Sequence, residues 1–179
     1  MSIANKIIPH YTYEDWIHWE GSWELIEGHP IAMSPTPIPA HQRVAAELTT
    51  ALTLALRQAK CKDCFTYNPL DYKISEDTIL VPDVLVICGE VKKKYLDFPP
   101  TLVIEILSPS TALRDRHTKY ELYQKEGVKY YLIVNIDTKT IEFFELVNTQ
   151  YQLRSGANNF KFNLDNNCSI EPELGNIFS

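Results

Sequence analysis

The stretch LVIEILSPST, residues 102–111, decides the fold of this 179-residue chain. Its first six residues are apolar except Glu105, a pattern typical of a strand that is buried on both faces. Ser-Pro-Ser-Thr then ends the strand and begins a helix, which we expect over Thr111–Glu126, before Gly127. This step from a strand to a helix predicts the first half of a β-α-β unit.

The sequence outside this stretch predicts a mixed sheet. KYYLIVN at Lys129–Asn135 is a second buried strand, and a strand-helix-strand order predicts a parallel pair with a right-handed crossover. Helical periodicity at Ala40–Lys60 predicts a long amphipathic helix. Further strands are expected at Trp23–Pro35 (as a hairpin with its turn at Glu27-Gly28-His29), Cys64–Asn68, Leu70–Ser75, Val81–Cys88, Thr140–Val147 and Tyr151–Arg154. We therefore predict an α/β fold, a mixed β-sheet flanked by α-helices, with residues 1–179 forming one domain.

Two carboxylates lie in strand-like apolar runs. Asp83 is in VPDVLVI, and Glu105 is in the run already quoted. A buried carboxylate is costly unless it is paired or binds a metal, so two of them on neighbouring strands suggest a shared divalent cation, Mg²⁺ or Mn²⁺. The alternative is that both residues lie at strand ends and are merely solvated.

The composition limits the classes of protein that this chain can represent. Hydrophobic residues make up 45% and charged residues 22%, and the net charge is −6. That charge argues against a protein that coats nucleic acid non-specifically, but acidic metal-site residues contribute to it, so a nuclease remains possible. No apolar run approaches the roughly 18 residues that span a membrane, and the N-terminus lacks a signal-peptide core. We expect no membrane association and a cytoplasmic location.

The four cysteines predict neither a disulfide framework nor a zinc site. Cys61 and Cys64 form one CxxC, whereas Cys88 and Cys168 are isolated in the sequence. A structural zinc site usually takes two close pairs, and the second pair is missing. Reduced thiols are therefore the expectation.

Several motifs together resemble a known family. In order along the chain they are Trp23-Glu24-Leu25-Ile26-Glu27-Gly28, Ser34-Pro35 with His41, Pro82-Asp83, Val103-Ile104-Glu105-Ile106-Leu107-Ser108-Pro109-Ser110-Thr111, Asp115 with Lys119 and Tyr123, and Gly127-Val128-Lys129-Tyr130-Tyr131. The chain resembles the Uma-type family of restriction-endonuclease-like proteins, abundant in cyanobacteria, within the PD-(D/E)XK nuclease superfamily. The resemblance spans nearly the whole chain.

The resemblance implies a restriction-endonuclease-like fold and a catalytic set of Asp83, Glu105 and Lys119, with the first two as metal ligands. One position departs from the superfamily pattern. The lysine expected two residues after the acid is replaced by Leu107, which implies that Lys119 on the following helix takes its role. Lys73, on the strand before Asp83, is the second candidate.

Asp115, Lys119 and Tyr123 are spaced i, i+4, i+8 and therefore share one helix face. The alternative is an ordinary surface ion pair between Asp115 and Lys119. Asp115 and Tyr123 are secondary site candidates. Glu24 could be a further acid near the metal or a plain hairpin residue, and His41 could contact phosphate, the metal site or only the helix start.

The leading functional hypothesis is a metal-dependent endonuclease that hydrolyses phosphodiester bonds in DNA. One alternative is a catalytically inactive nuclease-fold module that binds protein or nucleic acid, and another is a metal-dependent phosphoesterase on another substrate. A homodimer is plausible, since cleavage of both strands by one-site enzymes usually needs two subunits.

Overall fold

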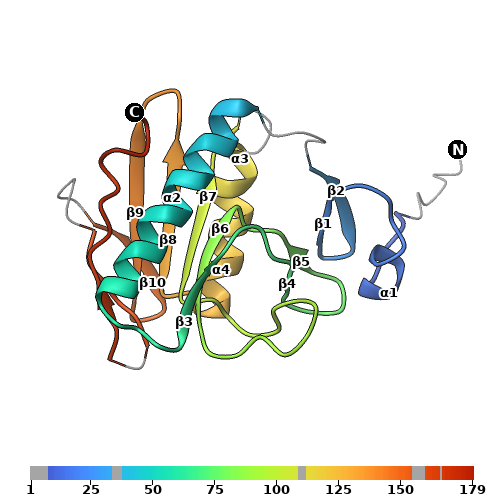
Figure 1. Ribbon diagram of the computed structural model, residues 1–179. Coiled ribbons are helices and arrows are strands. Elements are labelled where there is room, and N and C mark those ends of the chain that lie inside the picture. Colours follow the sequence, from blue (N-terminus) through green and yellow to red (C-terminus); the bar gives the residue numbers. More distant parts are fainter. Residues whose placement is uncertain (1–7, 34–37, 109–111, 155–159, 166) are drawn as a thin grey trace, which may run out of the picture.

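A six-stranded sheet with the strand order β10-β9-β8-β7-β6-β3 forms the centre of the molecule (Figure 1). The computed structural model describes residues 8–33, 38–108, 112–154, 160–165 and 167–179. Strands β7 and β8 are parallel, and the other neighbours are antiparallel. The strands are β3 (Cys64–Tyr67), β6 (Val84–Cys88), β7 (Leu102–Ile106), β8 (Tyr130–Asn135), β9 (Thr140–Val147) and β10 (Gln150–Leu153). The predicted α/β fold, including its parallel pair, is confirmed.

Helices cover both faces of this sheet (Figure 1). Helix α2 (Pro39–Gln58) packs on one face against alternate β6 and β7 side chains, among them Val84 and Ile104. The opposite face carries Leu85 and Val103, which belong to the buried cluster around Tyr123. This second layer is one helical run of three parts, α3 (Ala112–Arg114), η1 (Asp115–Lys119) and α4 (Tyr120–Glu126).

The helix after β7 differs from the expectation in one respect. Five of its residues, Asp115–Lys119, form a π-helical turn, whereas a regular α-helix was expected. π-Turns are rare and often occur at functional sites, where they shift the register of the side chains that follow. The helix ends as expected at Gly127, whose φ of 82° is left-handed. The expected helix start at Thr111, and the motif residues 34–35 and 109–111, lie outside the described residues.

A smaller four-stranded sheet lies beside the first, with the order β2-β1-β5-β4 (Figure 1). Its strands are β1 (Trp23–Ile26), β2 (His29–Ala32), β4 (Tyr72–Lys73) and β5 (Ile79–Leu80). The strand expected at Leu70–Ser75 is thus reduced to two residues. The strand expected at Val81–Cys88 begins only at Val84, because Pro82 has no N–H to give to a sheet. The remaining elements are α1 (Tyr13–Trp16), β11 (Phe162–Asn163) and β12 (Ser169–Ile170).

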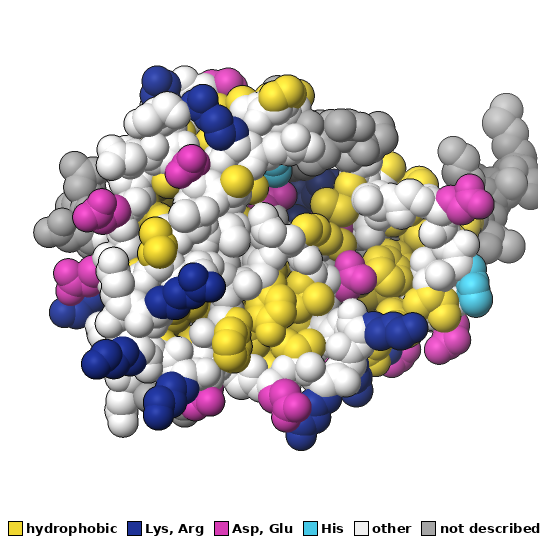
Figure 2. All heavy atoms as spheres, in the orientation of Figure 1, with side chains coloured by type: hydrophobic (Ala, Val, Ile, Leu, Met, Phe, Trp, Pro, Cys, Tyr) yellow, Lys and Arg dark blue, Asp and Glu magenta, His cyan; other side chains and the backbone are white. Residues whose placement is uncertain are grey.

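The surface carries charges of both signs. Figure 2 shows Lys and Arg side chains interspersed with Asp and Glu over the visible face. Among the described helices, none combines the length and the apolar character that crossing a bilayer requires.

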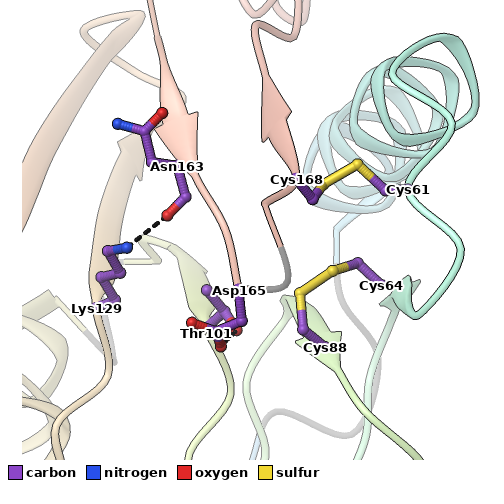
Figure 3. The surroundings of a disulfide bond; sticks show 8 residues. All are labelled: Cys61, Cys64, Cys88, Thr101, Lys129, Asn163, Asp165 and Cys168. Atoms are coloured by element: carbon purple, nitrogen blue, oxygen red, sulfur yellow. Dashed lines mark hydrogen bonds between the residues drawn. A yellow bond between two sulfur atoms is a disulfide. The ribbon is translucent and has the colours of Figure 1, made fainter.

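All four cysteines are paired, so the expectation of reduced thiols is wrong (Figure 3). Cys61 bonds to Cys168 in the C-terminal segment, and Cys64 bonds to Cys88 directly opposite it on the neighbouring strand. These partners could not be predicted from the sequence because they are 107 and 24 residues apart. Spacing within the CxxC carries no information on contacts made by the fold.

We predict that the Cys61–Cys168 bond stabilises the fold more than the Cys64–Cys88 bond does. A crosslink that closes a longer loop removes more entropy from the unfolded chain. The double substitution of Cys61 and Cys168 by Ser should lower the free energy of unfolding by about 1 kcal/mol more than the same change at Cys64 and Cys88. Urea unfolding without reductant measures both losses. Equal losses, or four titratable thiols in the non-reduced protein, would contradict this.

Candidate active site

Asp83 and Glu105 lie at the same end of two neighbouring strands. In the antiparallel pair of β6 and β7 the register ends with Val84 opposite Ile104, and the next residue outward on each chain segment is Asp83 and Glu105 respectively. The two carboxylates are close enough for the Asp83 charge to act on Glu105. Asp83 Oδ2 also accepts a hydrogen bond of 2.8 Å from the backbone N–H of Ile106. The fold therefore brings the two predicted carboxylates together.

Glu105 is buried and receives two donors from the helix that follows it. Lys119 Nζ donates to Glu105 Oε1 at 2.9 Å, and the Tyr123 hydroxyl donates to the same oxygen at 2.7 Å. Only 2% of Glu105 and 2% of Lys119 are exposed. The helix packs back along the sheet, which allows Lys119 to reach the strand from which it is separated by 14 residues.

Lys119 is surrounded by carboxylates from three elements. Its Nζ lies 2.7 Å from Glu24 Oε1 on β1 and 3.6 Å from Asp115 Oδ1, in addition to the Glu105 contact. Glu24 is completely buried, and its Oε1 also accepts a hydrogen bond of 3.0 Å from the backbone N–H of Val81. The ammonium thus joins the small sheet, the large sheet and the π-helical turn.

The electrostatics of this cluster follow from burial and crowding. Burial raises the pKa of Glu105 well above its usual range, and nearby carboxylates add to that effect while Lys119 opposes it. Burial alone would lower the pKa of Lys119, but Glu105 and Glu24 outweigh it and raise that pKa above its ordinary value. Burial also raises the pKa of Tyr123, which keeps its hydroxyl a proton donor. Lys119 is therefore a stable ammonium, and Glu105 is a carboxylate whose ionisation depends on nearby cations.

His41 joins the site from the first turn of α2. Its Nε2 lies 3.4 Å from Asp83 Oδ2, and this hydrogen-bonding partner raises the pKa of His41 although burial works against it. Figure 2 shows a recess between the region of α2 and that of the small sheet in which histidine, acidic and basic side chains gather. His41 and Asp83 are partly exposed, with 15% and 20% of their side chains accessible, so the Asp83 end of the site meets solvent.

Lys73, the second candidate for the catalytic lysine, makes its contacts elsewhere. Its Nζ lies 2.5 Å from Glu76 Oε1 and 4.2 Å from the centre of the Tyr13 ring. A different cation, Arg114, was not predicted as part of the site, and its Nε lies 3.5 Å from Glu24 Oε2. The only local signal was its position one residue before Asp115, which does not distinguish it from a surface residue.

The donor set fits a cation that takes few protein ligands. Among the described residues, no group of three or more His, Cys, Asp or Glu side chains is arranged to hold a metal ion. Mg²⁺ is usually bound by one or two carboxylates, with waters and substrate phosphate completing its shell. Glu105 makes its contacts through Oε1 and Asp83 through Oδ2, so within the described part of the chain each keeps a second oxygen for such a cation.

Known proteins match this chain over most of its length. A protein of Synechocystis sp. (strain ATCC 27184 / PCC 6803 / Kazusa), "Uncharacterized protein slr1290", is 28% identical over 146 residues, which cover 76% of this chain and 74% of that protein. A solved structure from Anabaena variabilis ATCC 29413, titled as "a putative nuclease belonging to DUF820", superposes with a TM-score of 0.73 at 17% identity. The superposition covers 93% of this chain and 97% of the solved chain. At that identity the likeness establishes the fold alone.

The family expected from the motifs is confirmed by a family model that matches residues 11–175. Because that match spans nearly the whole sequence, the chain belongs to the Uma2 family, which is described as "Putative restriction endonuclease".

Proposed function

We propose that this protein is an endonuclease that hydrolyses phosphodiester bonds in DNA with the help of Mg²⁺ or Mn²⁺. The arrangement of three side chains carries the proposal. Asp83 and Glu105 lie at the same end of two neighbouring strands, and Lys119 Nζ lies 2.9 Å from Glu105 Oε1. The family description supports a nuclease, and the restriction-endonuclease class that it names makes DNA the substrate that we propose.

In this proposal Asp83 and Glu105 hold the cation, and the carbonyl of Ile106 is a third candidate ligand. The cation would polarise a phosphate oxygen and lower the pKa of a water molecule when it is bound. Asp83 is positioned for this role by the Ile106 N–H, which fixes one of its oxygens. Glu105 is positioned by Lys119 and Tyr123, which fix Oε1.

Lys119 would supply the positive charge that the superfamily places two residues after its acid. A buried ammonium beside the attacked phosphorus can orient a water molecule and stabilise the charge that develops on the phosphate oxygens. Asp115 lies four residues earlier, with its Oδ1 3.6 Å from Lys119 Nζ, and helps to keep Lys119 charged. His41 is available at the open side of the site to meet a phosphate group beside Asp83.

Two features of the proposal concern the protein as a whole. A homodimer would allow one active site to cut each strand of a duplex. A cytoplasmic location, expected from the sequence, stays a prediction. The two disulfides count against this location, because such bonds are uncommon in the cytoplasm.

We predict that purified protein nicks plasmid DNA with Mg²⁺ or Mn²⁺ and that excess chelator stops the reaction. Asp83→Asn and Glu105→Gln should each abolish detectable nicking, because a neutral amide binds a divalent cation poorly. Mn²⁺ titration calorimetry on the same proteins should show weaker binding in both variants.

Asp77→Asn and Glu145→Gln are matched controls, since these acids pair with His10 and Arg154 rather than with Lys119 or the residues next to it. Both should nick DNA at the rate of the unmodified protein. Binding of DNA by the unmodified protein without any cleavage would replace the proposal with the inactive binding module. Cleavage of another phosphate ester but not of DNA would favour the phosphoesterase.

We predict further that Lys119→Met lowers the cleavage rate by roughly 10²-fold or more, the scale of losing one donor to the transition state. Methionine keeps the length of the side chain but removes the charge. Because buried carboxylates then lose their partner, the variant should also be less stable, by about 3–5 kcal/mol. Rates are therefore compared at a temperature at which circular dichroism shows both proteins folded.

Lys73→Met is the matched control for this substitution, since Lys73 pairs with Glu76 rather than with Glu105. It should leave the rate within a factor of about two, as expected for a surface ion pair. A folded Lys119→Met protein with full activity, or a large loss in Lys73→Met alone, would reject the role of Lys119.

A further inference from the structure

Glu24 brings a buried carboxylate to the site from the small sheet, and its two oxygens have different partners. Oε1 accepts hydrogen bonds from Lys119 Nζ at 2.7 Å and from the Val81 N–H at 3.0 Å. Oε2 lies 3.5 Å from Arg114 Nε. No part of Glu24 is exposed to solvent, so its charge is met by protein groups such as these rather than by water.

This arrangement does not suit a metal ligand. Both oxygens of Glu24 face a cation, Oε1 facing Lys119 and Oε2 facing Arg114, whereas Glu105 meets Lys119 through Oε1 alone. A divalent ion on Glu24 would therefore lie next to a buried like charge at either oxygen, and such charges repel strongly. Oε1 is already occupied by an ammonium and a backbone N–H. Glu24 is therefore fitted to hold cationic side chains, in contrast to Asp83, which lies at the solvent-accessible end of the site.

Lys119 is shared between Glu24 and Glu105, and the contact with Glu24 is the shorter one. If Glu105 also binds a divalent cation, its attraction for the Lys119 ammonium weakens. Glu24 lies on the small sheet and does not bind that cation, so its ion pair with Lys119 is kept. The carboxylate of Glu24 is thus the partner that can fix the position of Lys119 during a reaction.

We propose that Glu24 is a positioning residue that fixes Lys119, and next to it Arg114, beside the Asp83–Glu105 pair without binding the metal. This inference rests on the proposed function and adds a residue that acts through Lys119. Because Arg114 meets Glu24 through Nε, its terminal guanidinium nitrogens are the ones that a substrate phosphate could reach.

The first test compares Glu24→Gln with the unmodified protein. Glutamine keeps the acceptor for the Val81 N–H and removes the charge that holds Lys119. We expect kcat to fall by about 10²-fold, the scale of a small misplacement of a catalytic group. KM for DNA and the Kd for Mn²⁺ should change by less than about threefold. A rise in the Mn²⁺ Kd as large as that in Asp83→Asn would make Glu24 a metal ligand and overturn the proposal.

A double-mutant cycle separates positioning from a general structural effect. If Glu24 acts through Lys119, adding Glu24→Gln to Lys119→Met should lower kcat no further. If the loss of kcat in the double variant is instead the product of the two single losses, Glu24 acts independently of Lys119, which would contradict the proposal. If Glu24→Gln does not fold, Glu24→Asp serves instead. It keeps the charge but shortens the side chain, and should lower kcat with an unchanged Mn²⁺ Kd.

A second readout does not depend on cleavage. Only 3% of the Lys119 side chain is exposed, so an amine-reactive reagent should label it slowly in the unmodified protein, as mass spectrometry can measure. We expect faster labelling of Lys119 in Glu24→Gln, with labelling of the exposed Lys92 unchanged as the internal reference. Unchanged labelling of Lys119 would overturn the positioning role. Absence of nuclease activity with faster labelling would refute the proposed function alone.

Discussion

One buried ammonium, that of Lys119, connects parts of the chain that the sequence places far apart. It contacts Glu24 on β1 at 2.7 Å and Glu105 on β7 at 2.9 Å, and it belongs itself to the π-helical turn. A buried charge that loses its partner is strongly destabilising, so each of these elements is constrained by the other two. The same contacts that hold the small sheet against the large one therefore also shape the site.

Among the described residues, carboxylates from three elements gather around Lys119. Glu24, Glu105 and Asp115 surround one ammonium, with Arg114 beside Glu24 as the second cation. Such crowding in a dry environment favours taking up a proton or a further cation, which is why burial and its neighbours raise the pKa of Glu105. Asp83, at the same end of the neighbouring strand as Glu105 and partly exposed, offers the route by which a cation could enter. The packing of the fold thus supports the proposal of a metal site.

The sequence predicts what depends on local pattern. The apolar run around Glu105, the helix after it and the parallel strand beyond it were predictable, because strand and helix periodicities are properties of neighbouring residues. Contacts between distant segments were not. Glu24 meets Lys119 across 95 positions, and Cys61 meets Cys168 across 107. The π-helical turn and the partner of Arg114 likewise depend on packing between layers, which no single stretch encodes.

The most direct test of this account is the anomalous difference map of crystals grown with Mn²⁺. We predict one peak about 2.1 Å from oxygens of both Asp83 and Glu105, at the usual metal–oxygen distance, with Lys119 still within hydrogen-bonding reach of Glu24. A peak bound to Glu24 in place of Lys119, or protein saturated with Mn²⁺ that shows no peak between Asp83 and Glu105, would contradict it.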